Sequence, residues 1–497
     1  MVRRVAWIVV ASLLVACGST ASAPSGLGSS SADDGMRVSA PGGGAGAQAP
    51  TRPPGAPGTG SGGVGDAIGV SSRPGTSGQS TTGGGPTTIA ASADRSPVAV
   101  GILYTNNDAA ASAGVDNGNT FSPRAVFESF VTAYNARGGI AGRPIEPVYV
   151  ELRSSSVDLP ADLQAACATF TQDNDVAVVL STTGVFSEEL ATCLSESGTP
   201  QIAGDYALGD ADSLAAAPML YAPATLTVDD RFGVLLDAVT DAGRVTTDDR
   251  IGVVVEGCAH NVRAYERSVE PAAARLGLTI TERVDSRCFQ GINDLSGLAS
   301  EMGSAVLRFR TASVSTVLFI SGSFEGNLML LFGAAAESQG YRPDYALTSA
   351  VAAKIQEANT PPSQLANAVG LGWLPAIDSV PPADELPAAQ RCLHDLRAAS
   401  GVVPASAADR YTVFTICDTF ALYDAALVLT SGASDAASVA AAIDRLDRSF
   451  AASATEGEAT DFGNGRRTGP ARGRLFAWSA ACDCFDYTSE PFGLRVS

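Results

Sequence analysis

The sequence predicts an α/β protein built from repeated strand–helix units. The first observation is a strand–helix–strand unit that spans residues 98–151. The second is a series of short apolar runs, such as Val176–Leu180 and Thr316–Ile320, typical of strands buried in a parallel sheet. The third is that segments with helical periodicity alternate with these runs. This alternation indicates doubly wound sheets, whose ligands bind beyond the carboxyl ends of the strands.

The opening unit carries clear local signals. Val98–Tyr104 and Ile145–Glu151 are the two strands. The helix between them begins where Ser122 can cap the first N–H groups, and Pro123 suits the first helical position. It ends at Gly138, which tolerates a positive φ. The apolar residues that share one face of this helix are Val126, Phe127, Phe130, Val131 and Tyr134. The loop between the first strand and the helix, Thr105–Phe121, is a candidate ligand site.

The remaining elements are expected in two groups and a tail. The first group has helices at 161–171 and 187–197, with strands at 176–180 and 201–203. The second has helices at 228–242, 262–276, 295–309 and 327–339, with strands at 250–255, 278–284, 316–320 and 344–348. The tail has helices near 384–399, 408–430 and 438–447 and a further crossing near 472–478.

The first 95 residues lack the signals of a folded domain. Arg3 and Arg4 precede the apolar run Val5–Val15, which is too short for a membrane span and is typical of a signal peptide. Leu14-Val-Ala-Cys17 resembles a bacterial lipobox, which implies a lipid on Cys17 and a location at the outer face of the cell membrane. The alternative is an ordinary secretory signal. Residues 18–95 are rich in Gly, Ser, Ala and Pro and predict a disordered tether.

Charge and cysteine content narrow the function classes. The formal net charge of −20 argues against nucleic-acid binding, because phosphates need basic partners. Eight cysteines follow Cys17, and an even number in an exported chain predicts disulfides. Sequence alone leaves their connectivity open. We expect neighbouring pairs: Cys167–Cys193, Cys258–Cys288, Cys392–Cys417 and Cys482–Cys484. No metal or cofactor is expected, since the spacing of the last pair does not suit zinc and neither histidine has a paired histidine nearby.

A family resemblance rests on Tyr134-Asn-Ala-Arg-Gly-Gly-Ile-Ala-Gly-Arg-Pro-Ile145. This segment resembles the signature after the first helix of type I periplasmic binding proteins, and more narrowly the branched-chain amino acid binding group of ABC importers. The resemblance implies two Rossmann-like lobes joined by a hinge of three crossings. Lobe 1 would comprise 96–224 and 346–472, and lobe 2 would comprise 225–345 and 473–497. The Cys167–Cys193 pair resembles the disulfide of that group.

The resemblance also implies a ligand site between the lobes. The corresponding positions are Thr182, Thr183, Gly184, Asp205 and Tyr206 in lobe 1 and His260, Asn261, Phe324, Glu325 and Ser349 in lobe 2. The acidic residue that the family places after the last strand of lobe 2 is replaced here by Ser349-Ala-Val351, so Asp205 or Glu325 would have to hold a ligand ammonium group. The alternative is that both acids are helix caps or solvated loop charges.

The expected function is therefore a lipid-anchored receptor that captures a small polar ligand, an amino acid or a related amide or carboxylate, for an ABC permease. Two alternatives use the same fold: a sensor that signals to a partner, and a surface lipoprotein without a transport role. An enzyme is not expected, because the sequence has no Gly-x-Ser-x-Gly, His-Glu-x-x-His or P-loop motif.

Overall fold

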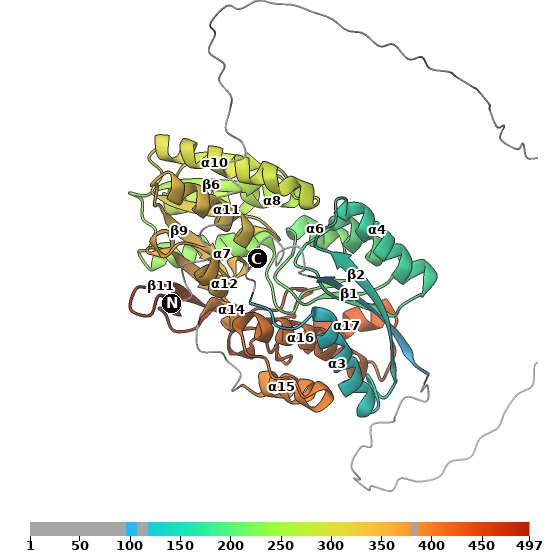
Figure 1. Cartoon of the computed structure of the whole chain (residues 1–497). Coiled ribbons are helices and arrows are strands. Elements are labelled where there is room, and N and C mark those ends of the chain that lie inside the picture. The colour runs from blue at the N-terminus through green and yellow to red at the C-terminus, as the bar shows by residue number, and fades with distance from the viewer. Residues whose placement is uncertain (1–95, 107–117, 380–385, 497) are drawn as a thin grey trace, which may run out of the picture. The chain divides into compact units, whose positions relative to one another are not determined.

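The computed structural model describes residues 96–106, 118–379 and 386–496, and Figure 1 shows how its elements are arranged. The predicted signal peptide, the Cys17 lipidation site, the tether at 18–95 and most of the loop Thr105–Phe121 lie outside the described residues.

The first sheet is parallel and has five strands in the order β2-β1-β3-β4-β5. Its strands are β1 Val98–Asn106, β2 Ile145–Arg153, β3 Val178–Thr182, β4 Gln201–Ala203 and β5 Leu220–Tyr221. Helices α3 Pro123–Ala136, α4 Leu159–Ala168, α5 Glu188–Glu196 and α6 Ala211–Ala216 connect them. As predicted, the Ser122 hydroxyl accepts a hydrogen bond from the N–H of Ala125 at the start of α3.

Alternate residues of β1 pack against opposite layers of helices. Ile102 and Tyr104 belong to the core cluster that includes α3 and the later helix α16 (Ala407–Leu429). Leu103, between them, belongs to the cluster under α4 and α5. Figure 1 shows α4 on one side of β1 and β2, with α3 and α16 on the other. The continuous apolar run in β1 is thus explained by burial on both faces.

The second sheet has eight strands. Seven of them lie in the order β12-β11-β10-β9-β8-β6-β7, and the eighth, β13, pairs with β11. Its strands are β6 Arg250–Glu256, β7 Thr279–Ser286, β8 Thr316–Ile320, β9 Asp344–Thr348, β10 Val369–Gly372, β11 Arg472–Ser479, β12 Cys484–Tyr487 and β13 Phe492–Gly493. Strands β6 to β10 pair in parallel, whereas β11 is antiparallel to its neighbours.

Two layers of helices cover the second sheet. Val253 and Val255 of β6 pack in the core cluster that contains α7, whereas Val254 packs in the cluster of α10 and α11. The helices of this region are α7 Val228–Asp241, α8 Ala259–Ala264, α9 Glu270–Leu276, α10 Leu295–Thr311, α11 Glu325–Ser338, α12 Ala353–Asn359, α13 Pro362–Leu365 and α14 Pro375–Asp378.

The chain passes between the sheets three times, after β5, after β10 and before β11. The tail helices between the last two passages are α15 Pro387–Ser400, α16 and α17 Ala436–Leu446. Helices α15 and α16 pack beside α3, and α17 packs against α16. One expected boundary differs from the structure. The resemblance implies that the stretch 346–472 belongs to lobe 1, whereas strand β10 within it lies in the second sheet between β9 and β11.

Helix α16 is the one described helix that is long and apolar enough to cross a membrane. Most of its apolar residues are buried inside the protein, where it contacts α3, α15, α17 and the strands β3 and β4. A core helix of a folded domain has the same composition. Helix α16 is therefore a core helix of the folded domain.

The structure joins the eight described cysteines in the four neighbouring pairs that the sequence analysis expected. Cys167–Cys193 links α4 to α5, and Cys392–Cys417 links α15 to α16. Cys258–Cys288 ties the ends of β6 and β7 together, and Cys482–Cys484 lies in an exposed turn before β12.

Candidate functional site

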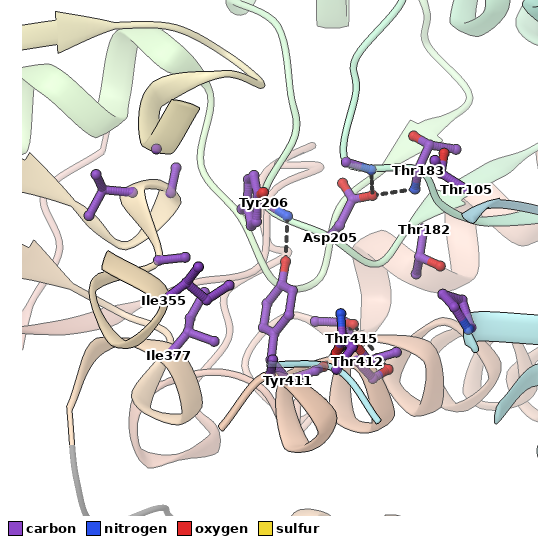
Figure 2. Close-up of a pocket in the computed structure, with 18 of the residues that line it drawn as sticks. Thr105, Thr182, Thr183, Asp205, Tyr206, Ile355, Ile377, Tyr411, Thr412 and Thr415 are labelled. Carbon is purple, nitrogen blue, oxygen red and sulfur yellow. Dashed lines mark hydrogen bonds between the residues drawn. The ribbon is translucent and has the colours of Figure 1, made fainter. Parts of the chain in front are cut away.

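A cavity of about 250 Å³ lies at the carboxyl ends of the first-sheet strands. The carboxyl ends of β1 and β3 contribute Thr105 and Thr182, and the loop after β4 contributes Asp205. The segment after β9 and helix α12 contribute Val351 and Ile355 from the second sheet. Figure 2 shows Ile355 and Ile377 on one side of this cavity, which we call the hinge pocket, and the threonines on the other. Its position agrees with the general rule for ligands of parallel sheets.

The Asp205 carboxylate connects the loops after β3 and β4 because it accepts hydrogen bonds from backbone N–H groups in both. Its Oδ2 accepts from the N–H groups of Thr183 (2.5 Å) and Gly184 (2.7 Å), and its Oδ1 accepts from the N–H of Ala207 (2.9 Å). The residue is 6% exposed. Burial raises the pKa of the Asp205 carboxyl to about 6, although the three N–H donors favour its ionised form.

Helix α16 supplies the floor of the hinge pocket. The N–H of Tyr206 donates to the Tyr411 hydroxyl (2.9 Å), and the two rings stack with centroids 5.9 Å apart (Figure 2). Gly204 lets the helix approach, because a Cβ there would lie 2.6 Å from the carbonyl oxygen of Thr415. The loop after β4 is therefore fixed against α16.

Two hydroxyls in the hinge pocket lack partners. The Oγ1 atoms of Thr105 and Thr182 are buried and have no hydrogen-bond partner among the described residues. Both residues line the pocket. A buried hydroxyl without a partner is costly, and a rotation about χ1 of Thr105 or Thr182 would turn it from the protein interior toward a polar group of a ligand.

A buried ion pair lies behind the pocket. Arg231 Nη1 and Glu325 Oε2 are 3.9 Å apart, and both side chains are almost fully buried. Arg231 also donates to the carbonyl oxygens of Tyr206 (2.7 Å) and Ser321 (3.0 Å), which connects the loop after β4 with the loop after β8. Burial raises the pKa of Glu325 to about 7 despite the nearby guanidinium and two hydrogen bonds from Thr348.

A second cavity of about 270 Å³ lies between the start of α5 and the loops after β6, β7 and β8. Phe186 helps to line it: its N–H donates to Ser323 Oγ (2.8 Å) and its ring meets the His260 ring edge-on at 5.2 Å. Burial lowers the pKa of His260 to about 4, so the imidazole is neutral at pH 7. Glu256 approaches Cys258 and Cys288 there, but the two sulfurs are bonded to each other.

Charged side chains connect the loops of the two sheets beside the second cavity. Asp210, before α6, is fully buried and accepts from Arg263 Nε (2.7 Å) and Arg267 Nη2 (2.5 Å), which follow β6. Arg263 also pairs with Glu188. Burial opposes ionisation of Asp210, but the hydrogen bonds from Arg263 and Ser213 outweigh it and lower its pKa to about 2. We call this group the arginine clasp.

The ten expected ligand positions fall into three groups. Thr182, Thr183, Gly184, Asp205 and Tyr206 line the hinge pocket. His260 and Phe324 line the second cavity. Asn261, Glu325 and Ser349 line neither and bond inside the protein, to Glu256, Thr348 and Asp378 respectively. Ligand binding at all ten positions stays a prediction.

The sequence analysis did not single out several residues of the hinge pocket. Tyr411 and Thr415 come from α16, and Ile355 and Ile377 from the segment around β10. A capping box at Ser406 and Asp409 fixes where α16 begins. That sequence signal could have placed the helix start, but not its contact with the loop after β4.

The comparisons with known proteins address the fold. No protein-family model and no curated protein matches the chain. A solute-binding protein of an ABC transporter from Rhodopseudomonas palustris BisB5, in complex with 3,4-dihydroxybenzoic acid, superimposes with a TM-score of 0.57 at 14% identity, covering 81% of this chain and 99% of that one. The chain has the type I periplasmic binding fold.

Two further structures agree on this fold. A possible leucine/isoleucine/valine-binding protein from Rhodopirellula baltica has a TM-score of 0.58 at 13% identity, covering 82% of this chain and 98% of that one. A branched-chain amino acid transporter substrate-binding protein from Streptococcus pneumoniae, in complex with isoleucine, has 0.55 at 12% identity, covering 80% and 99%. The type I periplasmic binding fold accounts for the two α/β sheets and their three connections.

Proposed function

We propose that this protein is an extracytoplasmic solute-binding protein that captures a small polar molecule in the hinge pocket and delivers it to an ABC importer. The observation that carries the proposal is a cavity between two facing sheets whose lining residues include Thr105 and Thr182, each with a hydroxyl that has no partner among the described residues. A cavity of about 150 Å³ is large enough for benzene, so the hinge pocket has room for a small organic ligand.

The fold supports this role without deciding the ligand. Two of the structural neighbours named above are a solute-binding protein of an ABC transporter in complex with 3,4-dihydroxybenzoic acid and a branched-chain amino acid transporter substrate-binding protein in complex with isoleucine. The proposed activity is binding rather than catalysis. We further propose that a lipid on Cys17 holds the protein at the outer face of the cell membrane. Fatty-acid labelling of the wild type but not of Cys17→Ala would support the anchor, and equal labelling would exclude it.

A thermal-shift screen of the purified protein against amino acids, small amides, carboxylates and sugars tests the binding role. A ligand that binds only the folded state raises the melting temperature by mass action. In Thr182→Val we expect the ligand-induced shift to be lost, whereas the melting temperature without ligand should equal or exceed that of the wild type. The reason is that the substitution removes a buried polar atom that lacks a partner.

Thr240→Val is the matched control, because Thr240 Oγ1 is also buried without a partner among the described residues and lies on α7, away from the hinge pocket. Its ligand-induced shift should match that of the wild type. A ligand that shifts Thr182→Val as much as the wild type would place binding elsewhere and remove the main support for this site.

A further inference from the structure

The turn from β3 to α5 presents two neighbouring backbone N–H groups, those of Thr183 and Gly184, beside the hinge pocket. Adjacent N–H groups in such a turn form a concave anion-binding site for a carboxylate or phosphate. In this protein the site is already filled from within. A single oxygen, Asp205 Oδ2, accepts from both groups at 2.5 and 2.7 Å.

The Asp205 carboxylate is held in place by its own loop. Its second oxygen accepts from the N–H of Ala207, and the following residue, Tyr206, is bonded through its N–H to Tyr411 and through its carbonyl oxygen to Arg231. Because Gly204 touches α16, the strand end cannot move toward the helix. The carboxylate is thus a fixed part of the pocket wall.

Asp205 is also the only charged side chain among the described residues that line the hinge pocket. The remaining lining is apolar or carries neutral hydroxyl, amide and phenol groups. A ligand carboxylate would lose its water, find no cation, and lie beside a like charge, which is unfavourable in a buried site. Asp205 is 6% exposed and three backbone N–H groups cover its oxygens, so a ligand ammonium would lose its water without gaining a direct hydrogen bond to the carboxylate.

We propose that the hinge pocket takes an uncharged ligand with a hydroxyl or primary amide group and an aliphatic or aromatic body, and that Asp205 is the residue that excludes carboxylates. The inference rests on the proposed function and narrows its ligand class. The ligand's polar group would lie at Thr105 and Thr182, which can both donate and accept. Its apolar body would lie against Ile355 and Ile377, across the pocket in Figure 2.

Two matched ligand series that vary charge alone test the proposal. One is isovaleramide, isovalerate and isopentylamine, and the other is benzamide, benzoate and benzylamine. Titration calorimetry and thermal shift at pH 7.5 should show binding of an amide by the wild type, and binding at least tenfold weaker for the matching carboxylate and amine. Wild-type binding of a carboxylate or amine as tight as that of its amide would overturn the proposal.

Asp205→Ala frees the two N–H groups and removes the charge. We expect this variant to bind the carboxylate of a series at least tenfold more tightly than the wild type does. Asp424→Ala is the control, because Asp424 also accepts from a backbone N–H, that of Ala141, but does not line the pocket. Its carboxylate affinity should equal that of the wild type. An Asp205→Ala protein that folds and gains no carboxylate affinity would overturn the role of Asp205.

The two proposals can fail separately. A charged ligand that binds the wild type but does not bind Thr182→Val would leave the binding role intact and overturn the inference. If no member of either series, and no compound of the wider screen, binds the wild type or Asp205→Ala, the binding role itself is overturned, and the inference with it. Should Asp205→Ala not fold, the wild-type charge series still decides the ligand class.

Discussion

Asp205 and Asp210 lie five residues apart between β4 and α6, and both are buried, yet their surroundings have opposite effects. Asp205 receives hydrogen bonds only from backbone N–H groups, and burial raises its pKa to about 6. Burial also opposes ionisation of Asp210, but hydrogen bonds from Arg263 and Ser213 and the charge of Arg263 outweigh it, and the pKa of Asp210 falls to about 2. The comparison shows that burial alone does not set the charge state of a carboxyl; the formal charge of its partners does.

The two carboxylates also differ in what they connect. The partners of Asp205 all belong to the loops after β3 and β4, so its hydrogen bonds shape one wall of the hinge pocket. The partners of Asp210 include Arg263 and Arg267, which lie on the helical segment after strand β6, so the arginine clasp joins the loop before α6 to the helices of the second sheet. The hydrogen bonds of Asp205 are therefore local to the hinge pocket, whereas the ion pairs of Asp210 connect the two lobes.

The largest expected effect comes from breaking the arginine clasp. Replacing both Arg263 and Arg267 with Ala would leave Asp210 buried without a cation, and we expect the free energy of unfolding to fall by about 3–5 kcal/mol. Urea denaturation measures this loss. The control is Arg275→Ala, which removes an exposed pair with Asp237 (2.7 Å) and should cost no more than about 1 kcal/mol. Equal losses in the two proteins would show that the clasp contributes no more than a surface pair.

A change of pH is expected to have a smaller effect on the free energy of unfolding. Several carboxyl groups have pKa values raised by burial, as Asp205 does, rather than lowered like that of Asp210. Burial raises the pKa of Glu325 and Asp418 to about 7 and that of Asp378 to about 8. The folded protein therefore binds more protons than the unfolded chain up to pH 8, and its stability falls as the pH rises through this window. His260, whose pKa is lowered to about 4, opposes this trend only below its unfolded value of 6.5.

We therefore expect the free energy of unfolding to be higher at pH 6.5 than at pH 8, by about 1–3 kcal/mol. Denaturant unfolding at the two pH values, at constant ionic strength, measures the difference. Carboxyl groups paired like Asp210 change protonation only near pH 2 to 4 and do not contribute in this window. A protein that is equally stable at both values, or more stable at pH 8, would contradict the raised pKa values.

The smallest expected effect concerns ligand charge. Because the pKa of Asp205 is about 6, its carboxyl is mostly neutral at pH 5, whereas benzoate stays largely ionised. We expect the affinity of the wild type for benzoate to rise a few-fold between pH 7.5 and pH 5 in titration calorimetry. Asp205→Ala should show no such rise. The same rise in both proteins would assign the pH dependence to another group.

Much of the fold follows from local patterns. The strands Thr316–Ile320 and Asp344–Thr348 have the bounds that the sequence predicted, because continuous apolar runs identify strands buried on both faces. Strand β10 was missed because it is short and contains Gly370 and Gly372. Both glycines serve distant contacts: a Cβ at Gly370 would lie 2.2 Å from the Phe476 ring, and one at Gly372 would lie 2.5 Å from Asp378. Contacts of this kind between residues distant in the chain cannot be read from the sequence around β10.

The candidate site could be predicted only in part for the same reason. The ends of β3 and β4 can be placed from their apolar runs; the last residue of β3 is Thr182, and the loop after β4 supplies Asp205 and Tyr206. The orientation of the Asp205 side chain depends on backbone N–H groups in two loops, those after β3 and β4. The sequence alone leaves open whether Asp205 binds a ligand or caps a helix. Tyr411 reaches the pocket from a helix about 200 positions further along the chain.

The order of the disulfides has a consequence for biogenesis. From Cys167 onward the described cysteines form four disulfides, each between two cysteines that are consecutive in the chain, with separations of 26, 30, 25 and 2 residues. A polypeptide that is oxidised as it emerges from a membrane, N-terminus first, meets each native partner before any later thiol arrives. If the chain is exported as proposed, vectorial oxidation yields the native pairs directly, and we expect its oxidation to need no isomerase to reshuffle mispaired bridges.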